Sequence, residues 1–212
     1  MSEPTTTATN AESNATKSGL WAELESLRTP AAKDAAPTPK VGSKAPSTWR
    51  LPLPDGRKTL VLFLRHCGCS FAEKTFKALT AISDRNKTVV HCIAVSHSSV
   101  EDTERWVLQV GGVWQTDIIV DEGRDIYAAW GLGLSSTWNM INPFALYSAY
   151  RLGADEGIWN RPTESGSRWQ TSGAFAVDED GTVRWEHISR TAADLPNFDD
   201  ALEALGISGP PA

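Results

Sequence analysis

The sequence predicts an α/β fold, and two observations support this prediction. Short apolar stretches of strand length alternate with stretches in which apolar residues recur at helical spacing. The strand-like stretches are apolar throughout, which is typical of a parallel sheet that helices cover on both faces. With 212 residues, of which 41% are hydrophobic and 22% charged, the chain is long and apolar enough for one domain with a core of ordinary size.

In the first half of the chain, each predicted strand leads into a predicted helix. The densest apolar run, residues 60–64, is followed by apolar residues at helical spacing as far as Ile82. Ser98 or Ser99 is placed to cap the second helix, and Gly131 to end the third. The predicted strands span 59–65, 88–95 and 117–120, and the predicted helices span 70–82, 100–110 and 125–130.

The second half of the chain is less regular until its end. Residues 131–170 carry many aromatic side chains on a glycine-rich background, whereas Asp180-Gly181 between two apolar runs is a strong hairpin signal. The predicted elements are a helix at 144–152, strands at 173–177 and 182–186, and a helix at 194–205. The order βαβαβα, then a β-hairpin and a C-terminal helix, predicts a thioredoxin-like fold with a central mixed sheet and helices on both faces.

The N-terminal region differs from the middle of the chain in composition. Residues 1–17 hold almost no apolar side chains and are expected to be disordered, while 18–28 has the spacing of a short helix. Residues 29–47 return to Ala, Pro, Lys and Ser, as in a linker or in an arm extended over the domain. We therefore expect an N-terminal arm over 1–40, a domain over 41–207 and a tail over 208–212.

Charge and hydropathy argue against several classes of function. The net charge is −6, and no cluster of Lys and Arg is present that would bind nucleic acid. No apolar run approaches the roughly 20 residues of a membrane span, and residues 1–10 lack both the apolar core of a secretion signal and any Arg. We therefore expect a cytoplasmic protein that binds neither nucleic acid nor membranes. Its three cysteines are expected to be catalytic, redox-active or buried thiols rather than a disulfide framework.

The stretch with the most chemical information is FLRHCGCSFAE, residues 63–73. It predicts a buried strand, a tight glycine turn and a helix that starts at once, with Cys69 at or just before the first helical turn. The N–H groups and the dipole of a helix start favour a thiolate, which is the reactive form of cysteine. Arg65 and His66 are close enough in sequence to add positive potential, and Ser70 could cap the helix or donate to the sulfur.

The remaining cysteines allow more than one interpretation. Cys92 lies inside a predicted strand, where a cysteine is most often a small buried apolar residue. Cys67 either fills space beside the turn or pairs with Cys69, in a disulfide that would be strained and easily reduced. The spacing of His66, Cys67 and Cys69 matches no common zinc site, so no metal is expected. His97 is expected near the site, as a base or as a surface or capping residue.

The stretch around Cys69 resembles the peroxiredoxin-like 2 branch of the alkyl hydroperoxide reductase/thiol-specific antioxidant (AhpC/TSA) family, in which an Arg, a Gly-Cys pair and a Cys-x-x-Cys run into a helix. The later stretch 169–187, WQTSGAFAVDEDGTVRWEH, is similar to the strand, hairpin and following His of that family, so that the similarity spans roughly 42–206. The resemblance implies a thioredoxin-like fold, a reactive Cys69, no bound cofactor, and an external thiol reductant such as glutathione or thioredoxin.

Three features depart from the pattern of that family. The second Cys of Cys-x-x-Cys falls on Ala72, so that disulfide cannot form. The Pro-x-x-x-Thr-x-x-Cys of standard peroxiredoxins is absent, and their late Arg corresponds to about Ser172. Activation of a thiolate and of a peroxide oxygen needs a cation or a base, for which Arg65, Arg161 and Arg168 are the candidates.

We therefore expect a thiol-dependent oxidoreductase that reduces a peroxide or a disulfide through Cys69. The oxidised sulfur would be a sulfenic acid or a mixed disulfide, resolved by Cys67 or, as we favour, by an external thiol. Two alternatives stay open: an enzyme of this fold that acts on a bulky apolar small molecule in an aromatic pocket, and a non-catalytic module that binds a protein partner. A homodimer is a further option. The candidate catalytic residues are Cys69, Cys67, Arg65, His66 and Ser70, and the candidate substrate-binding residues are Trp138, Trp169, Gln170, Thr171 and Arg168.

Overall fold

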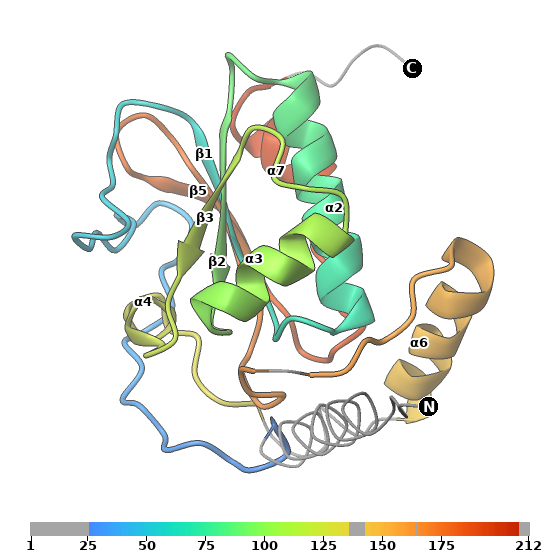
Figure 1. The fold of residues 1–212 in the computed structure, drawn as a ribbon. Coiled ribbons are helices and arrows are strands. Elements are labelled where there is room, and N and C mark those ends of the chain that lie inside the picture. Colours follow the sequence, from blue (N-terminus) through green and yellow to red (C-terminus); the bar gives the residue numbers. More distant parts are fainter. Residues whose placement is uncertain (1–25, 136–142, 164, 208–212) are drawn as a thin grey trace, which may run out of the picture.

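A five-stranded mixed sheet lies at the centre of the molecule, in a computed structural model that describes residues 26–135, 143–163 and 165–207. Its strand order is β3-β2-β1-β4-β5 (Figure 1). The strands are β1 (Thr59–Phe63), β2 (His91–Ser96), β3 (Thr116–Val120), β4 (Gly173–Val177) and β5 (Val183–Ile188). The first three are parallel, whereas β4 pairs antiparallel with β1, and β5 with β4. This is the mixed sheet that the element order predicts.

Helices cover both faces of the sheet, as predicted (Figure 1). The described helices are α2 (Ser70–Arg85), α3 (Val100–Gln109), α4 (Asp125–Ala129), α6 (Pro143–Glu156) and α7 (Phe198–Ala204). In β1, Leu60 and Leu62 pack in the core formed with α2, α3 and α7. Val61 and Phe63 pack in the second core, which contains α4. Because both faces of β1 are covered, all five of its residues are buried, and from Leu60 on its sequence is apolar without alternation.

Capping residues account for where two of these helices begin. Ser99 caps α3, its hydroxyl accepting a hydrogen bond from the backbone of Asp102, as the sequence indicates. The last helix begins at Phe198, later than predicted, because a proline at position 196 disfavours helical backbone in the residue before it. Asn197 then caps α7 through its side chain.

The described part of the N-terminal arm lies along the domain. Ala36 N donates to Ala128 O at 2.9 Å, and Gly42 N donates to Val183 O at 2.8 Å. Residues 36 and 42 of this segment (blue in Figure 1) therefore contact the domain. The predicted helix at 18–28 falls almost entirely outside the described residues, as does the disorder expected for 1–17. None of the described helices is long and apolar enough to cross a membrane.

Candidate active site

Cys69 lies at the start of α2, a few residues beyond the carboxyl end of β1. It is the N-cap residue of the helix, at the position that the sequence predicts, and it is 4% exposed. However, its side chain accepts no capping hydrogen bond from the helix start. Asn160 Oδ1 takes one of the N–H groups there, accepting from Ser70 N at 2.9 Å. The Ser70 hydroxyl is buried without a hydrogen-bond partner among the described residues, so it neither caps the helix nor donates to the sulfur.

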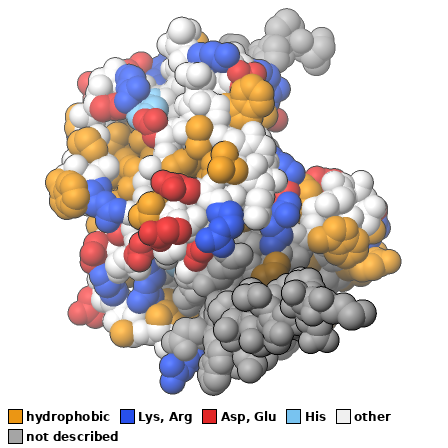
Figure 2. All heavy atoms as spheres, viewed as in Figure 1, with side chains coloured by type: hydrophobic (Ala, Val, Ile, Leu, Met, Phe, Trp, Pro, Cys, Tyr) orange, Lys and Arg blue, Asp and Glu red, His pale blue; other side chains and the backbone are white. Residues whose placement is uncertain are grey.

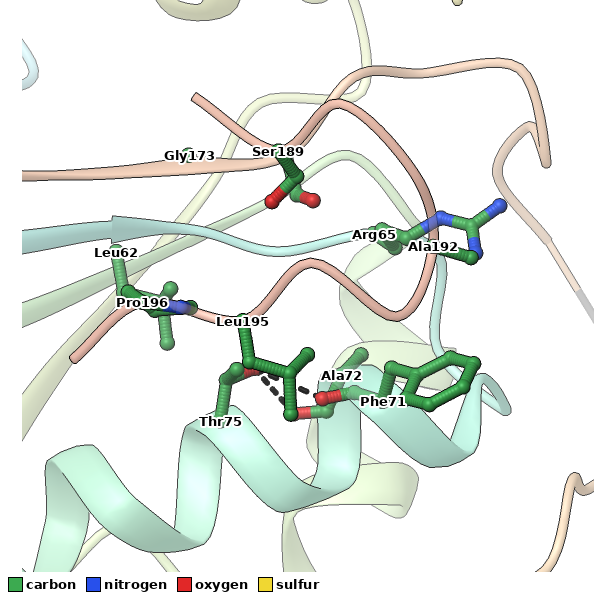
Figure 3. A pocket seen from close by; sticks show the side chains of 11 residues that line it. Leu62, Arg65, Phe71, Ala72, Thr75, Gly173, Ser189, Ala192, Leu195 and Pro196 are labelled. Atoms are coloured by element: carbon green, nitrogen blue, oxygen red, sulfur yellow. Dashed lines mark hydrogen bonds between the residues drawn. The ribbon is translucent and has the colours of Figure 1, made fainter. Parts of the chain in front are cut away.

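Arg65 brings a positive charge to the sulfur. Its Nη1 donates to Cys69 Sγ at 3.7 Å, and its Nη2 donates to Arg168 O at 2.9 Å. Figure 3 shows the side chain extended beside Ala192, with the guanidinium directed away from Leu62. A guanidinium held from two sides can stabilise a negative charge on the sulfur or on an oxygen bonded to it, because little reorganisation is needed when the charge forms.

His66 does not add to this charge, in contrast to the expectation from its position in the sequence. Its ring is buried, and Nδ1 lies 3.0 Å from Cys67 O and 3.3 Å from Thr163 Oγ1. Burial, followed by the nearby Arg65 guanidinium, holds the pKa of His66 well below its ordinary value. The imidazole is therefore neutral at neutral pH, and Arg65 is the cation of the pair.

The Cys67 thiol contacts β2 and α3. Its Sγ lies 3.7 Å from Ser96 Oγ and 3.9 Å from Thr103 Oγ1, and burial raises its pKa. It lines a cavity of about 170 Å³ beside α3, whereas Cys69 lines a separate cavity of about 120 Å³ beside α6. Burial raises the pKa of Cys92 to about 12, in agreement with a structural role for that thiol. Among the described residues, no group of three or more His, Cys, Asp or Glu is arranged to hold a metal ion.

A segment far along the chain covers the turn before Cys69. We call residues 160–163 and 165–168 the strap. Arg161 N donates to Gly68 O at 2.8 Å. Gly68 has φ +98°, and a Cβ there would lie 2.7 Å from Pro162 O. The turn therefore needs glycine both for its backbone conformation and for the close approach of the strap.

The strap is also fixed to the end of β2. Ser167 N donates to His97 Nε2 at 3.1 Å, and Ser98 Oγ donates to Ser165 O at 3.2 Å. Burial lowers the pKa of His97 to about 4, so the ring is neutral and its Nε2 can accept the hydrogen bond. His97 is close to the site, as predicted, and it contacts the strap there.

The structure brings only some of the predicted site residues together. Arg65, His66, Cys69 and Arg168 line one cavity, while Trp138 lies outside the described residues. Among the described residues, the lining consists of Arg65, His66, Gly68, Cys69, Phe71, Ala145, Leu146, Ala149, Asn160, Arg161, Arg168 and Ala192.

The other predicted substrate-binding residues make contacts elsewhere. Trp169 Nε1 donates to Leu27 O at 3.0 Å, and Gln170 Nε2 donates to Leu132 O at 2.8 Å. Thr171 lines a different surface cavity, next to β5. Sequence reasoning missed Asn160, because its contact joins residues 90 positions apart and no local pattern indicates it.

Comparison with known proteins decides the family. A family model described as AhpC/TSA antioxidant enzyme matches residues 77–191, which is more than half of the chain. The chain belongs to the AhpC/TSA antioxidant enzyme family. The matched range begins after Cys69, so the assignment of this AhpC/TSA protein does not depend on the cysteine motif. Among curated protein sequences, none matches the chain.

Solved structures similar to this AhpC/TSA protein establish its thioredoxin fold. A peroxiredoxin-like protein from Aquifex aeolicus matches with a TM-score of 0.53 and 15% identity, over 81% of this chain and 89% of that chain. A cysteine-to-serine mutant of peroxiredoxin 6 of Arenicola marina matches with a TM-score of 0.57 and 15% identity, over 79% of this chain and 72% of that chain. A yeast mitochondrial 1-Cys peroxiredoxin matches with a TM-score of 0.51 and 15% identity, over 79% of this chain and 75% of that chain.

Proposed function

We propose that the chain is a peroxiredoxin-like thiol oxidoreductase in which Cys69 reduces a peroxide and an external thiol regenerates it. The observation that carries this proposal is the contact of Arg65 Nη1 with Cys69 Sγ, at 3.7 Å, in a cavity at the start of α2. Membership of the AhpC/TSA antioxidant enzyme family supports the same class of reaction.

The oxidation of Cys69 follows from the chemistry of a thiolate beside a fixed cation. The thiolate attacks the terminal oxygen of the hydroperoxide, the O–O bond breaks, and the sulfur becomes a sulfenic acid. The released alkoxide takes up the proton that the thiol lost, so that a hydroperoxide is converted to an alcohol. Arg65 is placed to stabilise the thiolate before the attack and the separating oxygen during it.

An external thiol, rather than Cys67, is expected to resolve the sulfenic acid. Cys67 opens into a different cavity, and because burial raises its pKa, it is protonated and a poor nucleophile at neutral pH. One external thiol forms a mixed disulfide with Cys69 and releases water, and a second thiol then releases Cys69 with formation of a disulfide. The structure of the similar yeast protein concerns thiol resolution via glutathione/thioredoxin systems, which are the classes of reductant that we propose here.

The proposal is tested by trapping the sulfenic acid with dimedone after a mild pulse of hydrogen peroxide and locating the adduct by peptide mass spectrometry. We expect the adduct on Cys69, in the wild type and equally in the Cys92→Ser control. Arg65→Met should slow adduct formation by about tenfold or more, and Arg65→Lys should restore part of the rate, since one charge–charge contact at a site of this kind contributes about 1.4 kcal/mol or more. An adduct on Cys67 instead, or a rate unchanged in Arg65→Met, would contradict the proposal.

A further inference from the structure

We infer, on the basis of the function proposed above, that the Cys69 cavity selects organic hydroperoxides that carry both a carboxylate and an apolar body. The chain as a whole has a net charge of −6. The described residues of the cavity lining, in contrast, include three arginines and no Asp or Glu. A cationic cavity in an acidic protein indicates a site for an anion, because the surrounding field would otherwise repel one.

Arg161 is the arginine placed to bind that anion. Arg65 is already directed to the sulfur and to the strap backbone. Arg161 Nε lies 3.4 Å from Glu73 Oε2, but Lys77 Nζ also lies 2.6 Å from Glu73 Oε1. One carboxylate therefore faces two cations, and the group as a whole keeps a positive charge. The Arg161 side chain is 42% exposed, so a ligand can reach it from solvent.

Part of the cavity lining is apolar. Ala145, Leu146 and Ala149 of α6 line it, and Leu146 is 62% exposed. Hydrophobic side chains continue over the outer face of α6, with basic side chains between that helix and the body of the molecule (Figure 2). Tyr147 and Tyr150 of the same helix are exposed as well. The lining therefore combines cationic and apolar side chains.

The size of the cavity limits which part of a substrate enters it. A volume of about 120 Å³ is a little below the roughly 150 Å³ of a protein cavity that binds benzene. The hydroperoxide group and the carbon that bears it fit beside Cys69, while the rest of the molecule lies along Leu146 and extends its carboxylate to the rim at Arg161. Hydrogen peroxide, which is neutral and small, uses neither feature.

The test compares three peroxides with the same reacting group: cumene hydroperoxide, its para-carboxylate and the methyl ester of that carboxylate. The rate of Cys69 oxidation is followed by dimedone trapping and peptide mass spectrometry on the full chain. We expect the carboxylate to react about tenfold faster than the ester at low salt. This advantage should shrink in about 0.5 M NaCl, because salt screens a partly exposed ion pair.

Variants assign the advantage to one side chain. Arg161→Met should bring the ratio of carboxylate rate to ester rate close to one, and Arg161→Lys should recover part of it. Arg151→Met is the matched control, because Arg151 is an exposed arginine on α6 that does not line the cavity, and the ratio should persist there. Equal rates for carboxylate and ester in the wild type, or a ratio that survives in Arg161→Met, would overturn the inference while the function of Cys69 stands. If Arg161→Met instead slows only the recovery of Cys69 with glutathione, the bound anion is the reductant and the inference is wrong. If none of the three peroxides oxidises Cys69, the proposed function itself fails.

Discussion

Replacing Gly68 by alanine tests whether the strap holds the turn before Cys69. The new methyl group would lie 2.7 Å from Pro162 O and 3.0 Å from Arg161 O, and both are backbone atoms that cannot rotate away. The strap would have to move, and the 2.8 Å hydrogen bond from Arg161 N to Gly68 O would be lost or weakened. We therefore expect Gly68→Ala to reduce stability and also to expose Cys69.

The expected loss has two parts. Backbone with positive φ costs an L-residue about 1–2 kcal/mol relative to glycine, and a lost hydrogen bond with its displaced partner adds about 1–2 kcal/mol. Gly157→Ala is the matched control, since Gly157 has φ +70° but no atom within 4 Å of the added Cβ. The control should lose only the first part, so Gly68→Ala should be less stable than Gly157→Ala by about 1–2 kcal/mol.

Urea unfolding gives both free energies of unfolding, and peptide-resolved alkylation gives the accessibility of Cys69, which is 4% exposed in the intact site. We expect Cys69 to be alkylated several-fold faster in Gly68→Ala than in the wild type or in Gly157→Ala. Equal losses of stability in the two variants, together with an unchanged alkylation rate, would show that the strap does not press on Gly68 and would refute the reasoning.

Three further predictions concern the surroundings of the site. The pKa of His97 is about 4 in the folded chain, against an ordinary value of 6.5, so the unfolded chain binds this proton at a higher pH than the folded chain. The free energy of unfolding should therefore fall by up to about 3 kcal/mol as the pH drops from 6.5 to 4. Urea unfolding of His97→Gln should show a smaller fall over the same pH range. Because burial raises the pKa of Cys67, iodoacetamide should label it at neutral pH at least tenfold more slowly than Cys69, and the reverse order would contradict the assignment of the two thiols. Tyr127 OH lies 2.7 Å from both Leu64 O and Val95 O, so Tyr127→Phe should lower the free energy of unfolding by about 1–2 kcal/mol, and a neutral substitution would show that these carbonyls do not need the hydroxyl.

The sequence predicted the elements of the fold well, because each of them depends on near neighbours. The hairpin between β4 and β5 turns at Asp180-Gly181, and β1 follows from the run of five apolar residues at 60–64. The position of Cys69 at a helix start is also a local property. Helix boundaries were less accurate where a single residue decides them, as Pro196 does before α7.

The contacts of the site could not be predicted in the same way, because they join distant segments. Whether His66 carries a charge depends on its burial, and the strap that helps to enclose it follows about 100 residues later in the chain. The same strap supplies Asn160 to the start of α2 and the carbonyl that fixes Arg65. Neither partner stands out locally, since a loop Asn and a backbone carbonyl are ordinary features of any sequence.

The position of Arg65 explains how this chain can place a cation at the thiol although the late Arg of standard peroxiredoxins corresponds to about Ser172. Phe63 at the end of β1 pairs with Gly173 at the start of β4, so the residues just after β1 and just before β4 are neighbours at the same end of these two strands. Arg65 and Ser172 in fact line the same narrow space, drawn in Figure 3. From this position Arg65 Nη1 donates to Cys69 Sγ at 3.7 Å, whereas the Ser172 side chain carries no charge. A cation can therefore reach the Cys69 thiol from the segment just after β1, and the departure at position 172 does not by itself argue against a peroxidase.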